Sequence, residues 1–294
     1  MEDFKDIDII VATRIDNYER SMNAFLTYKF FKDHTINSKF IFVEDSIRPD
    51  LRDCLPLEQG DKIIYEKNNV KNVNGIDGEG EFRKCRSYNK GIKQSERKYL
   101  LFLDLDCVVN PAQIIKTKQN IEKELGFGIC YNGQPAYLTY EAKQIFADAP
   151  LLTTLENFHP NKTLLELALD NRKRGFPSWP DQLQYEYCKI MGVNACGGCL
   201  LGTRQEFFNI GGFNEKFVGW GYEDSEIISR IKILEKTIYR CNGKNDFLFH
   251  FPHTPSTVSV NIDRRIQLEN KKEAAIIEAM TKKELKKYIK TWQW

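Results

Sequence analysis

Short apolar runs alternate with segments of helical spacing over the first 125 residues, and this order constrains the fold more than any other feature of the chain. Four apolar runs predict strands, at residues 7–12, 39–43, 62–65 and 98–103. Three segments with helical spacing predict helices, at residues 18–31, 82–94 and 111–125. Strands that alternate with helices form mostly parallel sheets covered on both faces. The sequence therefore predicts an α/β fold with a doubly wound, mostly parallel central sheet.

The pattern is less regular after residue 130. Residues 131–191 contain helical stretches interrupted by four prolines and few convincing strands, so we expect the variable half of the protein there. Beyond it, the pattern predicts strands at residues 193–202, 237–241 and 246–249, and helices at residues 204–209, 222–234 and from 262 onward. We expect one domain over residues 1–255, and a helical C-terminal extension over residues 256–294.

Composition restricts the class of protein. With 41% hydrophobic and 29% charged residues, the 294-residue chain has the balance of a folded globular protein. A net charge of +2, with Lys and Arg spread along the sequence, gives no reason to expect a nucleic-acid partner. The N-terminus is acidic and no run approaches the ~20 apolar residues of a membrane span, so we expect a cytoplasmic protein. The eight cysteines lack the density of a disulfide scaffold, which predicts reduced thiols.

Two aspartates follow the most apolar strand directly. Asp104 and Asp106 lie two residues apart where the run at residues 98–103 ends. In an open α/β sheet, ligands bind at the carboxyl ends of the strands. Two carboxylates at that position can converge on one divalent cation, and oxygen ligands suit Mn²⁺ or Mg²⁺. A strand exit capped by solvated aspartates explains the isolated pair as well.

A second motif combines glycines, an aromatic residue and two acids. Gly211-Gly212-Phe213-Asn214 is followed by Gly219-Trp220-Gly221-Tyr222-Glu223-Asp224. Glycines allow a tight turn, and the flat face of an indole is a platform for a sugar ring. Paired acids at a helix start can accept a proton. The alternative interpretation is that the acids complement the helix dipole and the tryptophan fills the core.

Two of the four histidines lie together behind a predicted strand. His250 and His253 follow the run at residues 246–249, and either can complete the coordination of a cation. Together with Cys196 and Cys199 they also allow a zinc site of two cysteines and two histidines. The gap of about fifty residues and the strand-like surroundings of the cysteines argue against zinc.

Taken in order over roughly residues 5–255, these motifs resemble the β-1,4-galactosyltransferase family and its bacterial relatives, including chondroitin-polymerase-type transferase domains. The resemblance implies a GT-A (Rossmann-like) fold with a nucleotide-binding half at residues 1–130 and an acceptor-binding half at residues 131–255. It implies an inverting, metal-dependent transfer of a hexose or N-acetylhexosamine from a UDP-sugar donor to a glycan or lipid-linked saccharide acceptor, in surface polysaccharide or glycoconjugate synthesis.

The resemblance also assigns roles to individual residues. It makes Asp224 the general base and assigns Mn²⁺ (or Mg²⁺) to Asp106 and His253, with His250 at the position of a further ligand. It implies acceptor contacts from Trp220, Gly221 and Glu223. Contacts with the nucleotide fall to a larger set: Thr13, Arg14, Asp45, Phe82, Arg86, Asn89 and Asp104. Residues 131–191 do not match the family, so we expect them to decide the acceptor.

Three alternatives remain open. A retaining N-acetylgalactosaminyltransferase-like enzyme shares the Trp-Gly region and a metal histidine, but usually has His in place of Asp106 and Asn in place of Asp224. A haloacid-dehalogenase-type phosphatase has a similar nucleophile strand around Asp104, but there the strand usually opens the domain. A catalytically silent carbohydrate-binding module is the third alternative, and the retained acids argue against it.

The sequence also predicts roles for the glycine-rich segments and for the C-terminal segment. The glycine-rich loop at residues 68–80 and the Gly-Trp-Gly segment are candidates to close over the donor. The segment from residue 263 to 294 has nine Lys or Arg against five Asp or Glu, and it ends in two tryptophans. Such a helix can lie on an anionic membrane, which predicts peripheral contact with the inner face. Packing on the domain or on a second subunit explains the same segment.

Overall fold

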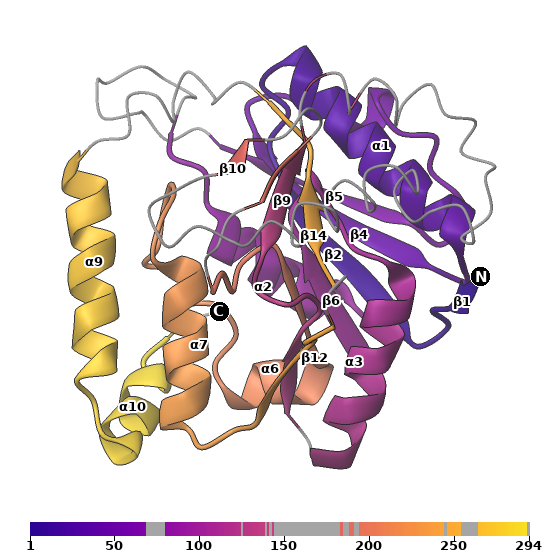
Figure 1. Ribbon diagram of the computed structural model, residues 1–294. Helices are drawn as coiled ribbons and strands as arrows, with labels where there is room; N and C mark the ends of the chain where they lie inside the picture. Colours follow the sequence, from indigo (N-terminus) through magenta and orange to yellow (C-terminus); the bar gives the residue numbers. More distant parts are fainter. Residues whose placement is uncertain are drawn as a thin grey trace.

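A seven-stranded sheet forms the centre of the protein in the computed structural model, which describes residues 1–68, 80–124, 126–138, 140, 143, 183–184, 188–190, 194–243, 246–253 and 264–292 (Figure 1). The strand order is β13-β8-β12-β6-β2-β4-β5. The strands are β2 (Ile7–Thr13), β4 (Lys39–Ser46), β5 (Lys62–Lys67), β6 (Tyr99–Leu103), β8 (Phe127–Ile129), β12 (Cys199–Thr203) and β13 (Ile238–Arg240). Strands β6, β2, β4 and β5 run parallel, and β12 is antiparallel to both of its neighbours. The predicted α/β class with a mixed, mostly parallel sheet is confirmed.

Helices cover both faces of this sheet, as the alternation of strand side chains requires. On one face Phe102 of β6 makes edge contacts with Tyr88 and Phe207. These rings belong to α2 (Lys84–Gln94) and α6 (Arg204–Asn209). On the opposite face Tyr99 of β6 donates a hydrogen bond to Glu122 of α3 (Pro111–Glu124), and the rings of β4 pack against α1 (Tyr18–His34). The buried rings therefore fix α1 and α3 on one face and α2 and α6 on the other.

A second, five-stranded sheet has the order β10-β11-β9-β14-β7. Its strands are β7 (Cys107–Val108), β9 (Pro135–Leu138), β10 (Leu183–Gln184), β11 (Cys188–Ile190) and β14 (Leu248–His250). Two short strands, β1 (Glu2–Asp3) and β3 (Thr35–Ile36), form a separate pair, and η1 (Leu51–Asp53) is a 3₁₀ turn. Strands β9, β10 and β11 lie in the segment where the sequence predicted few strands.

One predicted strand is wrong over part of its length. The sequence predicts a strand at residues 193–202, whereas β12 begins at Cys199 and residues 194–198 form a loop. Gly198 in this loop has φ of 84°, a left-handed conformation that interrupts a strand. Most of the glycine-rich loop at residues 68–80, where closure was predicted, lies outside the described residues.

Three helices pack together on the C-terminal side: α7 (Glu223–Ile233), α9 (Arg264–Glu278) and α10 (Lys282–Ile289) (Figure 1). Fully buried Arg230 of α7 bonds Glu226 and the carbonyl oxygens of Ile210 and Gly212. Its guanidinium lies 4.8 Å from the ring centre of Trp292. The helical C-terminal segment is thereby attached to α7. Among the described residues, none of the helices is both long enough and apolar enough to cross a membrane.

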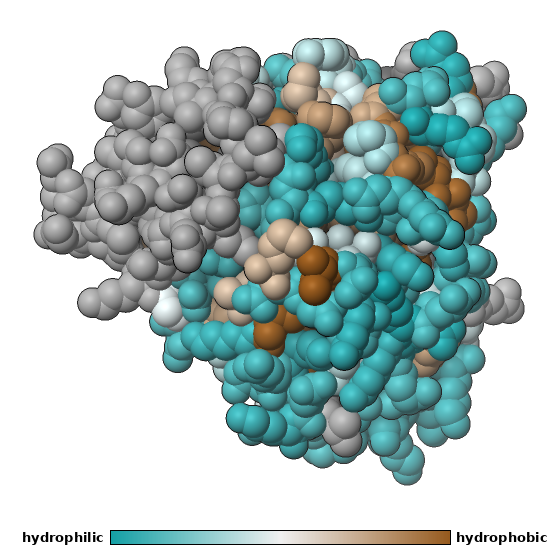
Figure 2. All heavy atoms as spheres, turned by 90° about the vertical axis from the view of Figure 1, so that its right-hand side faces the viewer, coloured by the Kyte–Doolittle hydropathy of each residue, from teal (hydrophilic) through white to brown (hydrophobic). Residues whose placement is uncertain are grey.

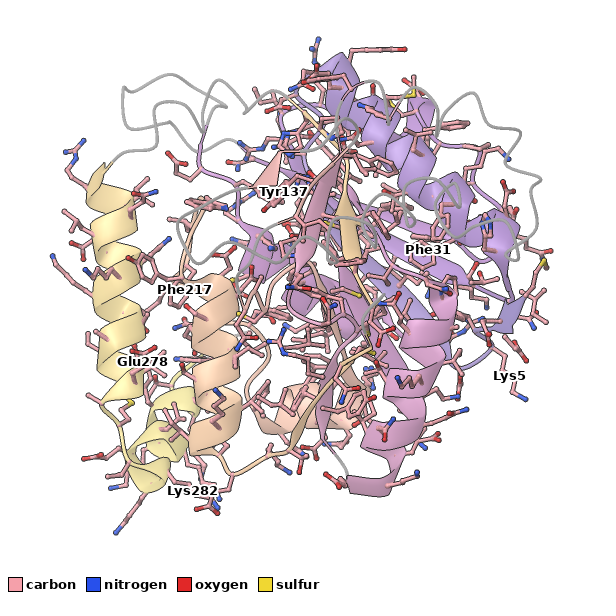
Figure 3. The ribbon with its side chains drawn as sticks, in the orientation of Figure 1. Lys5, Phe31, Tyr137, Phe217, Glu278 and Lys282 are labelled. Carbon is pink, nitrogen blue, oxygen red and sulfur yellow. The ribbon has the colours of Figure 1, made fainter. Side chains whose placement is uncertain are left out.

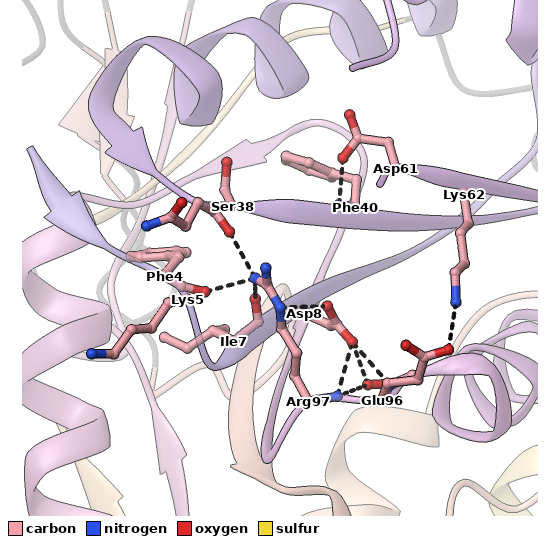
Figure 4. Close-up of polar contacts among 12 residues, drawn as sticks. Phe4, Lys5, Ile7, Asp8, Ser38, Phe40, Asp61, Lys62, Glu96 and Arg97 are labelled. Carbon is pink, nitrogen blue, oxygen red and sulfur yellow. Dashed lines mark hydrogen bonds and ion pairs between the residues drawn. The ribbon is translucent and has the colours of Figure 1, made fainter. Parts of the chain in front are cut away.

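Arg97 holds the edge of the central sheet at which β2 and β6 begin (Figure 4). Its Nη1 donates to the carbonyl oxygens of Phe4, Ile7 and Asn37 at 2.7–2.8 Å. The same guanidinium pairs with Asp8. These contacts tie the N-terminal segment to β2 and β6. Figure 2 shows the molecule from the right-hand side of Figure 1; outside the grey atoms this face is mainly hydrophilic, with smaller hydrophobic patches.

Candidate active site

A cleft of about 590 Å³ opens at the carboxyl ends of β2 and β6, within the usual size range of ligand sites. Most of the site residues predicted from the sequence line it: Thr13, Arg14, Phe82, Asp104, Asp106, Trp220, Glu223, Asp224, His250 and His253. They come from segments more than two hundred residues apart in the chain. The fold therefore brings the predicted cation ligands, the predicted base and the predicted acceptor platform into one cavity.

Asp106 and the two histidines meet because a tight turn follows β6. Cys107 donates its backbone N–H to the Asp104 carbonyl at 3.1 Å, which closes the turn. Strand β7 then pairs antiparallel with β14, with Cys107 opposite His250. Phe251 also donates its backbone N–H to the Asp106 carbonyl at 2.8 Å. This pairing, across some 140 residues of sequence, sets the histidines beside Asp106.

Each histidine of this cluster lies beside a different oxygen of the Asp106 carboxylate. His253 Nε2 lies 2.9 Å from Asp106 Oδ2, and His250 Nε2 lies 3.5 Å from Oδ1. Burial by itself raises the pKa of Asp106, but the two imidazoles outweigh it and hold this pKa well below its usual range. Asp106 is therefore ionised at neutral pH. A buried carboxylate facing two imidazoles is a donor set that fits a divalent cation.

Two further features support a cation site at this cluster. Nδ1 of His250 is a buried ligand-type atom without a hydrogen-bond partner, so one ring nitrogen of this cluster is unsatisfied. In the described part of the chain, Asp106, Cys107 and His250 each offer a ligand-type atom, and these three atoms lie within 4.8 Å of one another; His253 is not in this group but lies beside Asp106. Cys196 and Cys199 are not in this group either, so the described residues give no support to the zinc alternative.

Lys84 is the centre of a second charged cluster in the cleft. Its Nζ lies 3.0 Å from Asp104 Oδ1, 3.5 Å from Glu223 Oε1 and 3.6 Å from Asp224 Oδ1. Burial alone would lower the pKa of Lys84, but Asp104 and Asp224 outweigh it and raise this pKa well above its usual value. Lys84 is therefore a permanent cation that holds three carboxylates together. Tyr88, one turn later on α2, donates a hydrogen bond to Asp104 at 2.9 Å.

Asp224 has the electrostatics of a base that operates near neutrality. Burial raises its pKa to about 7, Lys84 opposes the rise, and Glu223 and Asp104 add to it. The side chain keeps 36% exposure, so solvent moderates the shift, and the direction is upward. A carboxyl group with a pKa near the working pH is suited to accept a proton. A Cβ at Gly197 would overlap the Asp224 carboxylate, so glycine leaves room for it there.

The Gly-Trp-Gly turn presents Trp220 to the cleft. Gly219 has φ of 67° and Gly221 has φ of 108°, which favour glycine at both positions. Gly221 donates its backbone N–H to Glu223 Oε2 at 2.9 Å. Trp220 is 66% exposed, so the indole does not fill the core as the alternative interpretation required. Glu223 is buried, and its carboxylate contacts both this turn and Lys84.

Four predicted site residues do not line the cleft. Buried Asp45 accepts hydrogen bonds from Arg14, Arg83 and Asn68. Asn89 exchanges hydrogen bonds with the backbone of Phe213, and Arg86 approaches Glu66 to 3.9 Å. Gly221 acts through its backbone in the Trp220 turn. The assignment of Asp45, Arg86 and Asn89 to a nucleotide stays a prediction, and these contacts give each of them a structural role.

The structure adds residues to the site that the sequence did not single out. Lys84 lies two positions after Phe82 in the first turn of α2, and its importance appears only when β6 and α7 are placed beside it. Tyr137 of β9 lines the cleft, and its ring centre lies 4.8 Å from that of His250 (Figure 3). Ile266 of α9 also lines it. The spacing of residues within one segment gave no indication of either.

Comparison with known proteins supports the resemblance found in the sequence. A family model described as the N-terminal domain of galactosyltransferase matches residues 182–254. This segment is galactosyltransferase-like. It contains the Gly-Trp-Gly turn, Asp224 and both cleft histidines, so the resemblance is confirmed over the residues matched. Beta-1,4-galactosyltransferase 4 of Cricetulus griseus is 34% identical over 71 residues. These make up 23% of this chain and 20% of that protein, so the galactosyltransferase-like match spans about a fifth of its length.

Two solved structures of a Drosophila enzyme are also similar to the chain. The catalytic domain of beta1,4-galactosyltransferase 7 with xylobiose is 16% identical, with 86% of this chain and 72% of that chain covered and a TM-score of 0.41. A mutant of this enzyme with manganese, UDP-Gal and xylobiose is 14% identical, with 91% and 80% covered and a TM-score of 0.44. Both TM-scores lie below 0.5, so any assignment of activity depends on the site itself.

Proposed function

We propose that this protein is a divalent-cation-dependent glycosyltransferase that moves a hexose or N-acetylhexosamine from a UDP-sugar to a hydroxyl group of a glycan, with inversion at the anomeric carbon. One observation carries the proposal: Asp224, with its raised pKa, shares a cleft with the Asp106, His250 and His253 cluster. This chemistry needs two parts: a base for the acceptor hydroxyl, and a site for the cation that serves the donor.

The cation site supports Mn²⁺ more than Mg²⁺. Asp106, His250 and His253 would hold the ion, and Mg²⁺ favours a shell made of oxygen ligands and water. Two imidazoles suit a softer first-row ion. When bound, the cation neutralises negative charge on the departing nucleoside diphosphate.

Asp224 would act on the acceptor. Its carboxylate takes the proton of the attacking hydroxyl as the oxygen forms a bond to the anomeric carbon. Lys84 keeps enough of the carboxylate ionised near neutral pH to do so, because it lowers the pKa that burial raises. Glu223 fixes the turn that carries Trp220, and the exposed indole offers a flat apolar face for the acceptor sugar.

The test is the transfer reaction with a matched variant. UDP-galactose, UDP-glucose, UDP-N-acetylgalactosamine and UDP-N-acetylglucosamine would each be incubated with phenyl β-glycosides and Mn²⁺, with release of UDP and the anomeric proton of the product measured. We expect transfer from an α-linked donor to give a β-linked product. Asp224→Asn should reduce kcat by about 10²- to 10⁴-fold. Asp33→Asn on α1, where Asp33 pairs with Lys29, is the control and should leave kcat unchanged.

The same reaction separates the alternatives. An α-linked product would support the retaining N-acetylgalactosaminyltransferase-like enzyme. Hydrolysis of phosphate monoesters in the absence of any sugar nucleotide would support the phosphatase. Sugar binding without turnover of any donor would support the binding module.

The proposal includes a cytoplasmic protein that makes peripheral contact with the inner face of a membrane. Such contact would serve a lipid-linked acceptor. The support is a cluster of lysines on α10 and directly after it: Lys282, Lys283, Lys286, Lys287 and Lys290. Trp292 packs on Arg230, which favours electrostatic binding over insertion of its ring. Flotation with vesicles containing 30% phosphatidylserine would test it. Binding that salt does not weaken, or that survives replacement of these lysines by glutamine, would contradict it.

A further inference from the structure

The turn that carries Trp220 is held at both of its ends by one side chain from the C-terminal segment. Asn270 Nδ2 donates hydrogen bonds to the carbonyl oxygens of Val218, at 3.0 Å, and Gly221, at 3.1 Å. These carbonyls lie immediately before and after the Gly219-Trp220 pair. The turn is also held by the bond from Gly219 N–H to the Phe82 carbonyl, at 2.8 Å, and by the bond from Gly221 N–H to Glu223.

Asn270 is built into a rigid support. It is 3% exposed and lies on α9, whose inner face also buries Ala274 and Ile277. The neighbouring Glu273 accepts a hydrogen bond from Asn214 at 2.9 Å, and Glu278 accepts one from Ser229 of α7 at 3.2 Å. Figure 3 shows Glu278 on the side of α9 that faces α7. Asn270 thus lies on a buried, hydrogen-bonded face of α9, whereas the indole of Trp220 is largely exposed.

The same helix reaches the cleft one turn earlier. Ile266 lines the cleft, and a Cβ placed on Gly219 would lie 3.5 Å from Ile266 Cγ2 and 3.2 Å from Glu81 Oε2. The glycine backbone is therefore close to α9 on one side and to the segment before α2 on the other. A change in the position of α9 relative to the turn would move Trp220.

From these contacts we infer that Asn270 is a positioning residue for acceptor binding: it holds the Trp220 turn so that the indole forms one wall of the cleft. The inference rests on the proposed glycosyl transfer. The chemistry requires this side chain, since a primary amide supplies two N–H donors and stays neutral. A carboxylate of the same shape offers only acceptors to two carbonyl oxygens. The ligand is a sugar whose apolar face lies on the indole.

The decisive variant is Asn270→Asp, which keeps the shape and removes both donors. Ser229→Ala is the matched control, because it also removes a hydrogen bond between α7 and α9 but leaves the Trp220 turn intact. The first measurement is ¹⁹F NMR of protein labelled with 5-fluorotryptophan, which gives one resonance for each of the four tryptophans. Trp220→Phe assigns the resonance of Trp220. The second measurement is the ratio of transfer to phenyl β-glycosides over hydrolysis of UDP-galactose by water.

In Asn270→Asp we expect the Trp220 resonance to shift or broaden, and the ratio of transfer to hydrolysis to fall by roughly 10- to 100-fold as the platform is displaced. Hydrolysis and manganese-dependent binding of UDP should stay within about twofold of wild type, since the cation cluster and Lys84 are untouched. Ser229→Ala should match wild type in every measurement. A general loss of structure would instead lower transfer, hydrolysis and UDP binding together.

Three outcomes would overturn the inference. An unchanged Trp220 resonance in Asn270→Asp would show that the amide does not hold the turn. A changed resonance with an unchanged ratio would show that the turn does not serve the acceptor, as would a wild-type Trp220 resonance that responds to none of the glycosides. If wild-type protein neither binds UDP nor hydrolyses UDP-galactose, the proposed function fails, and the ¹⁹F comparison still decides whether Asn270 holds the turn.

Discussion

Replacing Lys84 with methionine should move the pH dependence of the reaction upward. Lys84 is the buried cation that faces Asp104, Glu223 and Asp224. Its charge lowers the pKa of Asp224 against the upward effects of burial and the two neighbouring acids. Methionine keeps most of the length of the unbranched side chain and removes the charge. The base then becomes harder to ionise, so a higher pH is needed to form the carboxylate that accepts the proton.

The size of the shift follows from the geometry. Two unit charges 3.6 Å apart, the separation of Lys84 Nζ and Asp224 Oδ1, interact by about 1 kcal/mol in a medium like water and by about 4–5 kcal/mol at an effective dielectric constant near 20. Because the Asp224 side chain is 36% exposed, the lower end applies. About 1.4 kcal/mol corresponds to one pKa unit, so we expect an increase of about one unit. At pH 7 the ionised fraction would fall by about fivefold, and it would recover above about pH 9.

The assay is the pH profile of kcat/KM for transfer, compared between wild type, Lys84→Met and Lys90→Met. Lys90 lies on the same helix and pairs with Glu66 outside the cleft, so its replacement controls for the loss of one positive charge on α2. We expect the ascending limb to move in Lys84→Met alone. A Lys84→Met enzyme with lower activity at every pH and an unmoved ascending limb would contradict this prediction, because it would make Lys84 a binding residue with no influence on the base.

Three further predictions follow from the same structure. In Asp224→Asn the melting temperature should exceed that of wild type at pH 8 and approach it at pH 5, measured with a chelator present. Folding raises the pKa of the Asp224 carboxyl to about 7, so the stability that the protonated carboxyl contributes is present at low pH and is lost as pH rises through that value. After allowance for exposure we expect the variant to be more stable by about 1 kcal/mol at pH 8, and equal melting temperatures at pH 8 would count against the raised pKa. Mn²⁺ should support transfer at least about tenfold better than Mg²⁺ at equal concentration, because imidazole ligands disfavour Mg²⁺; equal rates would argue against both histidines as ligands. Arg230→Met should lower the free energy of unfolding by about 3–5 kcal/mol in urea titrations, because Glu226 would remain buried without its partner; a loss below about 1 kcal/mol would show that Glu226 finds another partner.

The sequence predicted strands β2, β4 and β6 of the central sheet well because they are continuous buried runs, whereas β8 was not predicted. Strand β2 and strand β6 fall within a residue of their predicted bounds, and β4 only extends further at its carboxyl end. The short strands were missed because their existence depends on distant partners. Strand β7 has two residues and forms only because β14, some 140 residues later, lies beside it. Local patterns carry no information about such a pairing.

The residues of the candidate site also differ in whether they could be predicted from the sequence. Asp106, Asp224 and the two histidines were predicted because each stands at a recognisable place, the exit of a strand or the start of a helix, and the cleft brings them together. Lys84 and Asn270 could not be predicted, since their importance comes from partners on other elements. A lysine in a helical segment and an asparagine in a charged helix are ordinary in the sequence. In the folded structure Lys84 contacts three carboxylates, and Asn270 donates hydrogen bonds to two backbone carbonyls.

Calorimetric titration of UDP into wild type and Asp106→Ala, with Mn²⁺ and with a chelator, tests the cation-dependent sugar-nucleotide site in this cleft, and GDP and ADP are the competing nucleotides. Asp33→Asn serves as the control for the loss of an acidic side chain. We expect UDP to bind wild type and Asp33→Asn only when Mn²⁺ is present, and Asp106→Ala not to bind it under either condition. UDP binding that is unaffected by the chelator and by Asp106→Ala, or no nucleotide binding at all, would contradict a cation-dependent sugar-nucleotide site in this cleft.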